Sequence, residues 1–237
     1  KHRAQKMQAG FFGDTKIRDS LYSCAPCREF RGRFAVVTRN GSVQRPDPSV
    51  QAGVVHPKTE QRFVLLSAPS LYFSESRIGD LVRICNSADI MQMIRQGGVP
   101  IGSKYPRRNA VSFIKYCNEG WEEDDHYVFF LVTDDGRQRI AGCYELRNRH
   151  RETFETGYWI APEYRGIGAT GLLALIEFCR TFQVGSLYAR ALEANQASRR
   201  LLEKAGFRCV RSKSEPGPYG TMLRYERSLR TRLKTPP

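Results

Sequence analysis

The chain has 237 residues, of which 41% are hydrophobic and 11% aromatic, a composition typical of a globular protein rather than of a disordered chain. No apolar run approaches the roughly 20 residues of a membrane span, and no signal-peptide pattern is visible. The formal net charge of +14 suits an anionic cofactor, RNA or an acidic surface, although solubility alone explains a basic protein equally well.

Seven cysteines are scattered through the chain without regular spacing. This pattern argues against a disulfide framework and for a reducing compartment, so we expect a cytoplasmic protein without a membrane partner. Cys143 and Cys179 lie in apolar segments, where we expect them to be buried. Cys24 and Cys27 form the one suggestive pair, but zinc needs two further ligands and a redox motif needs a strand–helix context. We therefore predict no metal site.

Residues 1–66 are expected to form an N-terminal extension or a small β module whose role the sequence does not indicate. The dipeptide Asn40-Gly41 suits the tight turn of a hairpin, and residues 61–67 are a further candidate strand. A globular domain is expected at 67–230, followed by a basic tail at 231–237.

Within that domain the segment 127–133 is continuously apolar, which is typical of a central strand covered on both faces. The other expected strands lie at 71–74, 138–146, 153–160, 187–190 and 221–226. The expected helices lie at 80–86, 88–95, 108–118 and 170–182. The apolar face of the last helix comprises Leu172, Leu173, Leu175, Ile176 and Phe178.

The strand at 153–160 leads into a glycine-containing helix start. Pro162 ends the strand because proline has no N–H to donate to a sheet. Gly166 and Gly168 allow the backbone to approach a ligand closely, and the free N–H groups at a helix start favour phosphate. Arg165 adds a fixed positive charge with forked donors. Together these features predict a cradle for a pyrophosphate.

Three groups of residues in this part of the chain form a recognisable set: Glu155-x-Gly157-Tyr158-Trp159, Arg165-Gly166-Ile167-Gly168 and Asn195-x-x-Ser198…Leu202-x-Lys204-x-Gly206-Phe207. Together they resemble the GCN5-related N-acetyltransferase (GNAT) superfamily, in particular its RimJ/RimL-like branch, over about residues 71–227. Thr170 departs from the family pattern, which has glycine or alanine there. This change places a bulkier side chain beside a phosphate-facing amide without removing the amide.

The resemblance implies an α/β (α+β) fold in which a mixed, mostly antiparallel central sheet is flanked by helices, here with an N-terminal extension. It also implies acetyl-CoA as the acetyl donor, with a pantetheine arm aligned along the backbone of Trp159, Ile160 and Ala161. Asn195 would bond to the cofactor arm. The pyrophosphate would be held by the Arg165 side chain and by the amides of Gly166, Ile167, Gly168, Ala169 and Thr170.

Amide formation needs a base for the amine and a proton for the leaving thiolate. Glu155 is the candidate base, because burial on a central strand would raise its pKa; the alternative is an ordinary salt-bridged carboxylate. Ser198 is the candidate proton donor, and its alternative is a capping hydroxyl in the first helical turn. Glu145, on the neighbouring strand, is a candidate for an alternative base or for a group that binds the acceptor amine.

The acceptor implied by the resemblance is a primary amine, most plausibly a protein or peptide N-terminal α-amine, whose pKa near 8 makes it easier to deprotonate than lysine. A polyamine, an antibiotic amine or an aminoacyl-tRNA remain alternatives, as does a non-catalytic module that binds RNA or protein. The acidic run Glu122–Asp125 is either a solvated loop or an electrostatic lip for a cationic amine.

Overall fold

The computed structural model describes residues 45–99 and 101–230, which form one open sheet of nine strands. The strand order is β1-β2-β3-β4-β5-β6-β9-β7, with β8 paired to β9, and every pair is antiparallel except β5 with β6. The strands are β1 (Gln51–Val55), β2 (Arg62–Ser67), β3 (Tyr127–Thr133), β4 (Ile140–His150), β5 (Thr153–Ile160), β6 (Ser186–Leu192), β7 (Arg208–Cys209), β8 (Glu215–Gly217) and β9 (Gly220–Ser228). This arrangement confirms the expected fold class.

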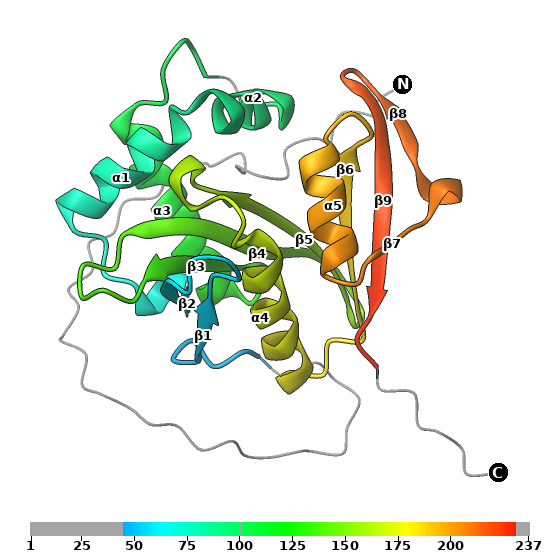
Figure 1. Ribbon diagram of the computed structural model, residues 1–237, viewed down its shortest axis with the longest axis horizontal. Coiled ribbons are helices and arrows are strands. Elements are labelled where there is room, and N and C mark those ends of the chain that lie inside the picture. The colour runs from blue at the N-terminus through cyan, green and yellow to red at the C-terminus, as the bar shows by residue number, and fades with distance from the viewer. Residues whose placement is uncertain (1–44, 100, 231–237) are drawn as a thin grey trace.

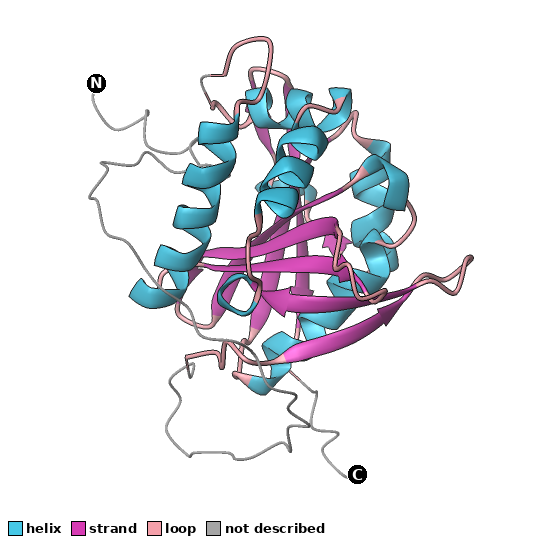
Figure 2. Cartoon of the chain, turned by 90° about the vertical axis from the view of Figure 1, so that its left-hand side faces the viewer, coloured by secondary structure: helices cyan, strands magenta, loops and turns pink. Residues whose placement is uncertain are grey.

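Helices cover both faces of the sheet (Figure 2). On β3, Phe130 packs edge-to-face against Phe113 of α3, whereas its neighbour Phe129 packs against Phe178 of α4. The two layers are therefore α1 with α3 on one face and α4 with α5 on the other (Figure 1). The helices are α1 (Glu75–Cys85), α2 (Ala88–Gln96), α3 (Arg107–Glu123), α4 (Gly168–Thr181) and α5 (Gln196–Lys204).

The centre of the sheet follows the sequence pattern closely. All seven residues of β3 are buried, as a continuously apolar strand requires. The bounds of β3 and β5 are those predicted, and β4 extends four residues beyond the predicted end at Leu146. On α4 the predicted apolar face is buried with one exception: Leu173 is 37% exposed, because it lies on the side of the helix turned away from the sheet.

The strands β5 and β6 pair over only three positions, Thr153 to Glu155 with Ser186 to Tyr188. On its other side β5 stays paired with β4 as far as Ile160, and β6 stays paired with β9 along its whole length. In Figure 1 the two strands lie together near the lower right and diverge upward. The edge of β5 from Thr156 to Ile160 therefore has no strand partner among the described residues.

The N-terminal part of the described chain belongs to the same sheet. β2 pairs with β3 from Phe63 to Ser67, so the boundary expected after residue 66 falls inside a strand. The strand expected at 71–74 is wrong: a short 3-10 turn (Ala68–Ser70) ends β2, and Ser74 caps the start of α1 with its side chain. α1 accordingly begins five residues before the predicted position.

Several expectations concern residues outside the described ones: the hairpin at Asn40-Gly41, the pair Cys24 and Cys27, and the tail at 231–237. Cys143 and Cys179 are buried, as predicted, and so are Cys85 and Cys117. Among residues 45–99 and 101–230, no helix has the length and apolar character that crossing a membrane requires.

Candidate active site

The unpaired half of β5 presents one edge of backbone N–H and C=O groups where β6 has moved away. Two buried donors on this half, Thr156 Oγ1 and Trp159 Nε1, have no hydrogen-bond partner among the described residues. Buried polar groups are nearly always paired, and an open strand edge accepts an extended ligand as an added strand. The separation of β5 from β6 therefore fits a long, amide-containing ligand lying along β5.

The start of α4 lies directly after this edge, beyond a short turn at Pro162–Tyr164. Its N-cap residue, Ile167, provides no side-chain bond to the helix, and the first helix-closing bond recorded there runs from Gly171 N to Ile167 O. The amides of Gly168, Ala169 and Thr170 therefore have no partner among the described residues. A helix start of this kind can bind an anion, so its geometry is compatible with the predicted cradle.

Two glycines of the cradle meet different steric demands. Gly166 has a φ of +105°, a conformation that residues with a side chain rarely adopt. Gly168 lies where α4 meets α5, and a Cβ added there would come within 2.4 Å of Leu201 Cδ1. Tyr144 supports the same turn from below, since its hydroxyl donates to the Gly168 carbonyl at 2.9 Å.

Arg165 lies in the turn, but its guanidinium is engaged elsewhere. It forms an ion pair with Asp89, in the first turn of α2, and about two thirds of each side chain is exposed. A second cross-link joins the same segments, because Arg83 of α1 pairs with Glu163 at 2.7 Å. The turn is thus tied to the α1–α2 layer by two ion pairs, and the Arg165 side chain is not aimed at the amides of α4.

Glu155 lies where β5 and β6 begin to separate, and its side chain is only 3% exposed. Its carboxylate accepts hydrogen bonds from Arg147 at 2.9 Å, Arg190 at 3.0 Å, Asn148 at 2.7 Å and Tyr188 at 3.3 Å. Burial opposes ionisation, but the charges of Arg147 and Arg190 outweigh it and hold the pKa of Glu155 below its ordinary value. The expected rise in pKa is therefore wrong.

Glu145, the second candidate base, is held in the same network. It lies opposite Gly157 in the register of β4 and β5. Its carboxylate accepts hydrogen bonds from the hydroxyl of Tyr116 on α3 and from Arg147, each at 2.5 Å. Arg147 therefore bridges the two carboxylates, and two arginines balance the charge of two buried glutamates.

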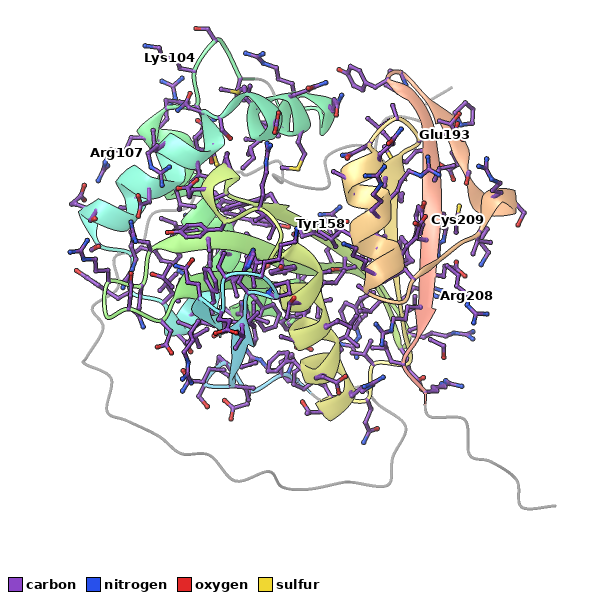
Figure 3. The ribbon with its side chains drawn as sticks, in the orientation of Figure 1. Lys104, Arg107, Tyr158, Glu193, Arg208 and Cys209 are labelled. Carbon is purple, nitrogen blue, oxygen red and sulfur yellow. The ribbon has the colours of Figure 1, made fainter. Side chains whose placement is uncertain are left out.

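Ser198 and Asn195 lie at the start of α5. Asn195 is the N-cap, and its side-chain oxygen accepts the N–H of Ser198 at 3.0 Å. The hydroxyl of Ser198 is thereby free of the capping role and lies 2.7 Å from the hydroxyl of Tyr158. Tyr158 is labelled in Figure 3. Burial raises the pKa of Tyr158 and outweighs the lowering effect of the Ser198 bond, so the phenol keeps its proton at neutral pH.

The structure adds contacts that the motifs did not indicate, including one made by Tyr158, which the motifs contain. The Tyr158 side chain pairs with Ser198, and Arg147, Asn148, Tyr188 and Arg190 hold Glu155. No local pattern predicted these contacts, because the partners come from other strands. The one available signal was the alternation of β6, which places Tyr188 and Arg190 on the same face of the sheet.

The sequence matches the family model of the acetyltransferase (GNAT) domain over residues 72–208, more than half of the chain. The chain therefore belongs to the GNAT acetyltransferase family, as its motifs indicated. No sequence among the curated proteins matches it.

Solved structures of low sequence identity share the fold. A proposed ribosomal-protein-serine acetyltransferase from Vibrio cholerae is 18% identical, with a TM-score of 0.58 over 76% of this chain and 98% of its own. RimJ from Mycobacterium smegmatis, in complex with CoA-disulfide, is 16% identical, with a TM-score of 0.58 over 76% and 88%. RimL, a ribosomal L7/L12 alpha-N-protein acetyltransferase in complex with coenzyme A, is 15% identical, with a TM-score of 0.53 over 73% and 97%.

Proposed function

We propose that the protein is an acetyl-CoA-dependent N-acetyltransferase whose acceptor is a primary amine, most plausibly the N-terminal α-amine of a protein or peptide. The observation that carries this proposal is the combination of the unpaired β5 edge with the open amides of α4. An edge that can pair with amides and a helix start that can hold phosphate lie in series, as the pantetheine and pyrophosphate of acetyl-CoA require.

The residues divide into two binding roles. The backbone of Trp159, Ile160 and Ala161 would align the pantetheine along the open edge of β5. The pyrophosphate would be held by the amides of Gly166, Gly168, Ala169 and Thr170, and by that of Ile167 in place of its present bond to Tyr164 O at 3.4 Å. Arg165 would exchange Asp89 for the pyrophosphate, which offers two charges in place of one. Asn195 would bond to the cofactor arm through its amide group.

Bound acetyl-CoA supplies the acetyl group as an activated thioester. Ser198 Oγ is the atom from which a proton would be delivered to the leaving sulfur, and Tyr158 fixes that oxygen at 2.7 Å. Tyr158 keeps its proton and donates it to the Ser198 carbonyl at 3.2 Å, so its hydroxyl holds both the carbonyl and the hydroxyl of Ser198 in place.

Glu155 is ionised at neutral pH and so can accept a proton, but its lowered pKa makes it a weak base. A weak base suffices for an α-amine with a pKa near 8 and serves a lysine side chain near 10.4 poorly. The chemistry of this carboxylate therefore favours an α-amine acceptor. Glu145 shares Arg147 with Glu155, so it would orient that guanidinium beside the base.

The test compares amines in one assay that measures free thiol released from acetyl-CoA. The acceptors are a peptide with a free N-terminus and no lysine, the same peptide with a blocked N-terminus and one lysine, spermidine, and an aminoacyl-tRNA. We expect kcat/KM for the free N-terminus to exceed that for the lysine peptide at least tenfold. If only spermidine or only the aminoacyl-tRNA is acetylated, that amine is the acceptor and the proposed N-terminal α-amine is wrong. Thiol release with none, together with salt-dependent RNA binding that ignores acetyl-CoA, would contradict the enzymatic proposal.

A further inference from the structure

The turn that would hold the pyrophosphate is contacted by a side chain far away in the sequence. His56 follows β1 and begins the turn to β2, which closes through His56 N donating to Gln61 O at 2.8 Å and Glu60 N donating to His56 O at 3.1 Å. The imidazole is 8% exposed, and its Nε2 lies 3.2 Å from the carbonyl oxygen of Arg165, 109 residues later. The β1–β2 turn thus lies against the cradle.

The hydrogen bonds of the ring determine its tautomer. Nδ1 lies 3.2 Å from the backbone nitrogen of Lys58 and 3.1 Å from that of Thr59. Both nitrogens are donors, so Nδ1 must be the unprotonated acceptor, and the proton of a neutral ring must be on Nε2. His56 Nε2 therefore donates to the Arg165 carbonyl. This bond holds the carbonyl toward the β1–β2 turn.

The orientation of this carbonyl sets the direction of the next amide. In a planar trans peptide the C=O of one residue and the N–H of the next point in opposite directions. Because the Arg165 carbonyl points to His56, the Gly166 N–H points away from the β1–β2 turn. The positive φ of Gly166 allows this orientation, and a Cβ at Gly166 would lie only 2.8 Å from His56 Nε2. The two residues are therefore fitted to each other.

A second contact holds the neighbouring part of the turn. Phe63 of β2 packs edge-to-face against Tyr164, with ring centroids 5.5 Å apart. The β1–β2 pair thus contacts both residues that precede Gly166, through Phe63 at the Tyr164 ring and through His56 at the Arg165 carbonyl.

We propose that His56 is a positioning residue for pyrophosphate binding: its Nε2–H fixes the Arg165–Gly166 peptide so that the Gly166 amide faces the ligand. This inference rests on the proposed use of acetyl-CoA. The β1–β2 turn, which contains His56, thereby has a role in cofactor affinity. The inference concerns only the cofactor and makes no claim about the acceptor site.

The test uses His56→Phe, which keeps a flat ring but removes both hydrogen-bonding nitrogens, and His56→Gln, whose amide can donate in place of Nε2. His150→Ala, an exposed histidine at the end of β4, is the matched control. Binding of acetyl-CoA is measured by calorimetry. Turnover is measured both with acetyl-CoA and with S-acetylpantetheine, which lacks the pyrophosphate.

We expect His56→Phe to weaken acetyl-CoA binding about tenfold or more, because the hydrogen bond from the Gly166 N–H to the charged pyrophosphate is lost. Turnover of S-acetylpantetheine and the KM of the acceptor should stay within twofold of wild type. His56→Gln should recover part of the affinity, and His150→Ala should match wild type.

Unchanged acetyl-CoA affinity in a folded His56→Phe would overturn the inference and leave the proposed function intact. An equal loss of turnover with acetyl-CoA and with S-acetylpantetheine would also overturn the inference, since the substitution would then have damaged the protein generally. If His56→Phe does not fold, His56→Leu decides, because it also lacks both ring nitrogens and unchanged acetyl-CoA affinity in the folded variant would contradict the role. Failure of the wild type to bind acetyl-CoA would instead contradict the proposed function itself.

Discussion

The two ends of β5 differ in how their polar groups are satisfied. At the Glu155 end, every oxygen of the buried carboxylate has partners from β4 and β6, and Arg147 connects it to a second glutamate. At the end that leads to α4, the strand edge and the helix amides have no partner among the described residues. The same strand thus changes, within eight residues, from a closed network to an open one.

This difference separates the end that the fold itself completes from the end that is open to the proposed cofactor. A closed network of buried charges holds three strands in one arrangement, because removing any member leaves another charge unpaired. An open edge contributes little to folding and can be completed by a ligand. We therefore expect substitutions at the first end to change stability, with a loss of turnover as well where they alter Glu155, and substitutions at the second end to change binding or turnover with little effect on stability.

The largest effect is expected for Arg147→Ala, which leaves Glu145 and Glu155 without the cation that bridges them. Loss of one partner of a buried ion pair costs about 3–5 kcal/mol of unfolding free energy. Arg149→Ala, two residues along the same strand and paired to Asp124 at 3.5 Å, should cost less than about 1 kcal/mol. Urea denaturation measures both, and equal small losses would show that the network is not a structural support.

The next effect is expected for Ser198→Ala, which removes the hydroxyl next to Tyr158 but leaves Asn195 able to cap the Ser198 amide. We expect kcat to fall about 10²-fold, the lower end of the contribution of a general acid, with the KM for acetyl-CoA within twofold. Ser198→Thr keeps a hydroxyl and should retain most activity. A lower melting temperature with unchanged kcat would instead identify Ser198 as a structural residue.

A smaller effect is expected on the unfolding free energy at acid pH. The pKa of Glu155 in the folded protein is below its ordinary value of 4.5, so its ionised form stabilises the fold above that pH. This contribution is lost as the pH falls through the lowered folded value. The unfolding free energy of the wild type should therefore decrease below pH 4.5, and that of Glu155→Gln should decrease less. The exposed Glu215→Gln serves as control, and parallel curves for all three proteins would rule out Glu155 as the source.

The smallest effect is expected for Asp89→Ala, which releases the exposed Arg165 side chain from its ion pair. A surface ion pair is worth at most about 1 kcal/mol, so acetyl-CoA affinity should rise by no more than about fivefold, and only at low salt. A titration at two ionic strengths measures this. Weaker binding in the variant would mean that Asp89 prepares Arg165 for the cofactor rather than competing for it.

The sequence predicted those parts of the structure that depend on local pattern. β3 was predictable because all of its residues are apolar, and β5 because Pro162 ends it at a defined point. A helix directly after the glycines was also predictable, although it begins at Gly168 and not at the predicted Thr170. The family resemblance supplied the rest of the fold class, since no composition or periodicity specifies a strand order.

The features that the sequence did not predict depend on contacts between distant segments. Burial of Glu155 was foreseen, but the arginines that reverse the effect of burial on its pKa include Arg190, 35 residues away on another strand. His56 gave no signal because its partner lies 109 residues later. The pairing of β2 with β3 joins segments more than 60 residues apart, so the first strands could not be assigned to the central sheet.

The most direct test of the open end of β5 is a calorimetric titration of acetyl-CoA into the wild type, Gly166→Ala and Gly136→Ala. Both glycines have a positive φ, +105° and +75°, but only Gly166 lies in the cradle; a Cβ at Gly136 would meet nothing within 4 Å. We predict 1:1 binding to the wild type and to Gly136→Ala, and binding weakened about tenfold or more in Gly166→Ala. No heat and no competition by CoA with the wild type, or equal affinity in all three proteins, would contradict the assignment of this end of β5 as the cofactor site.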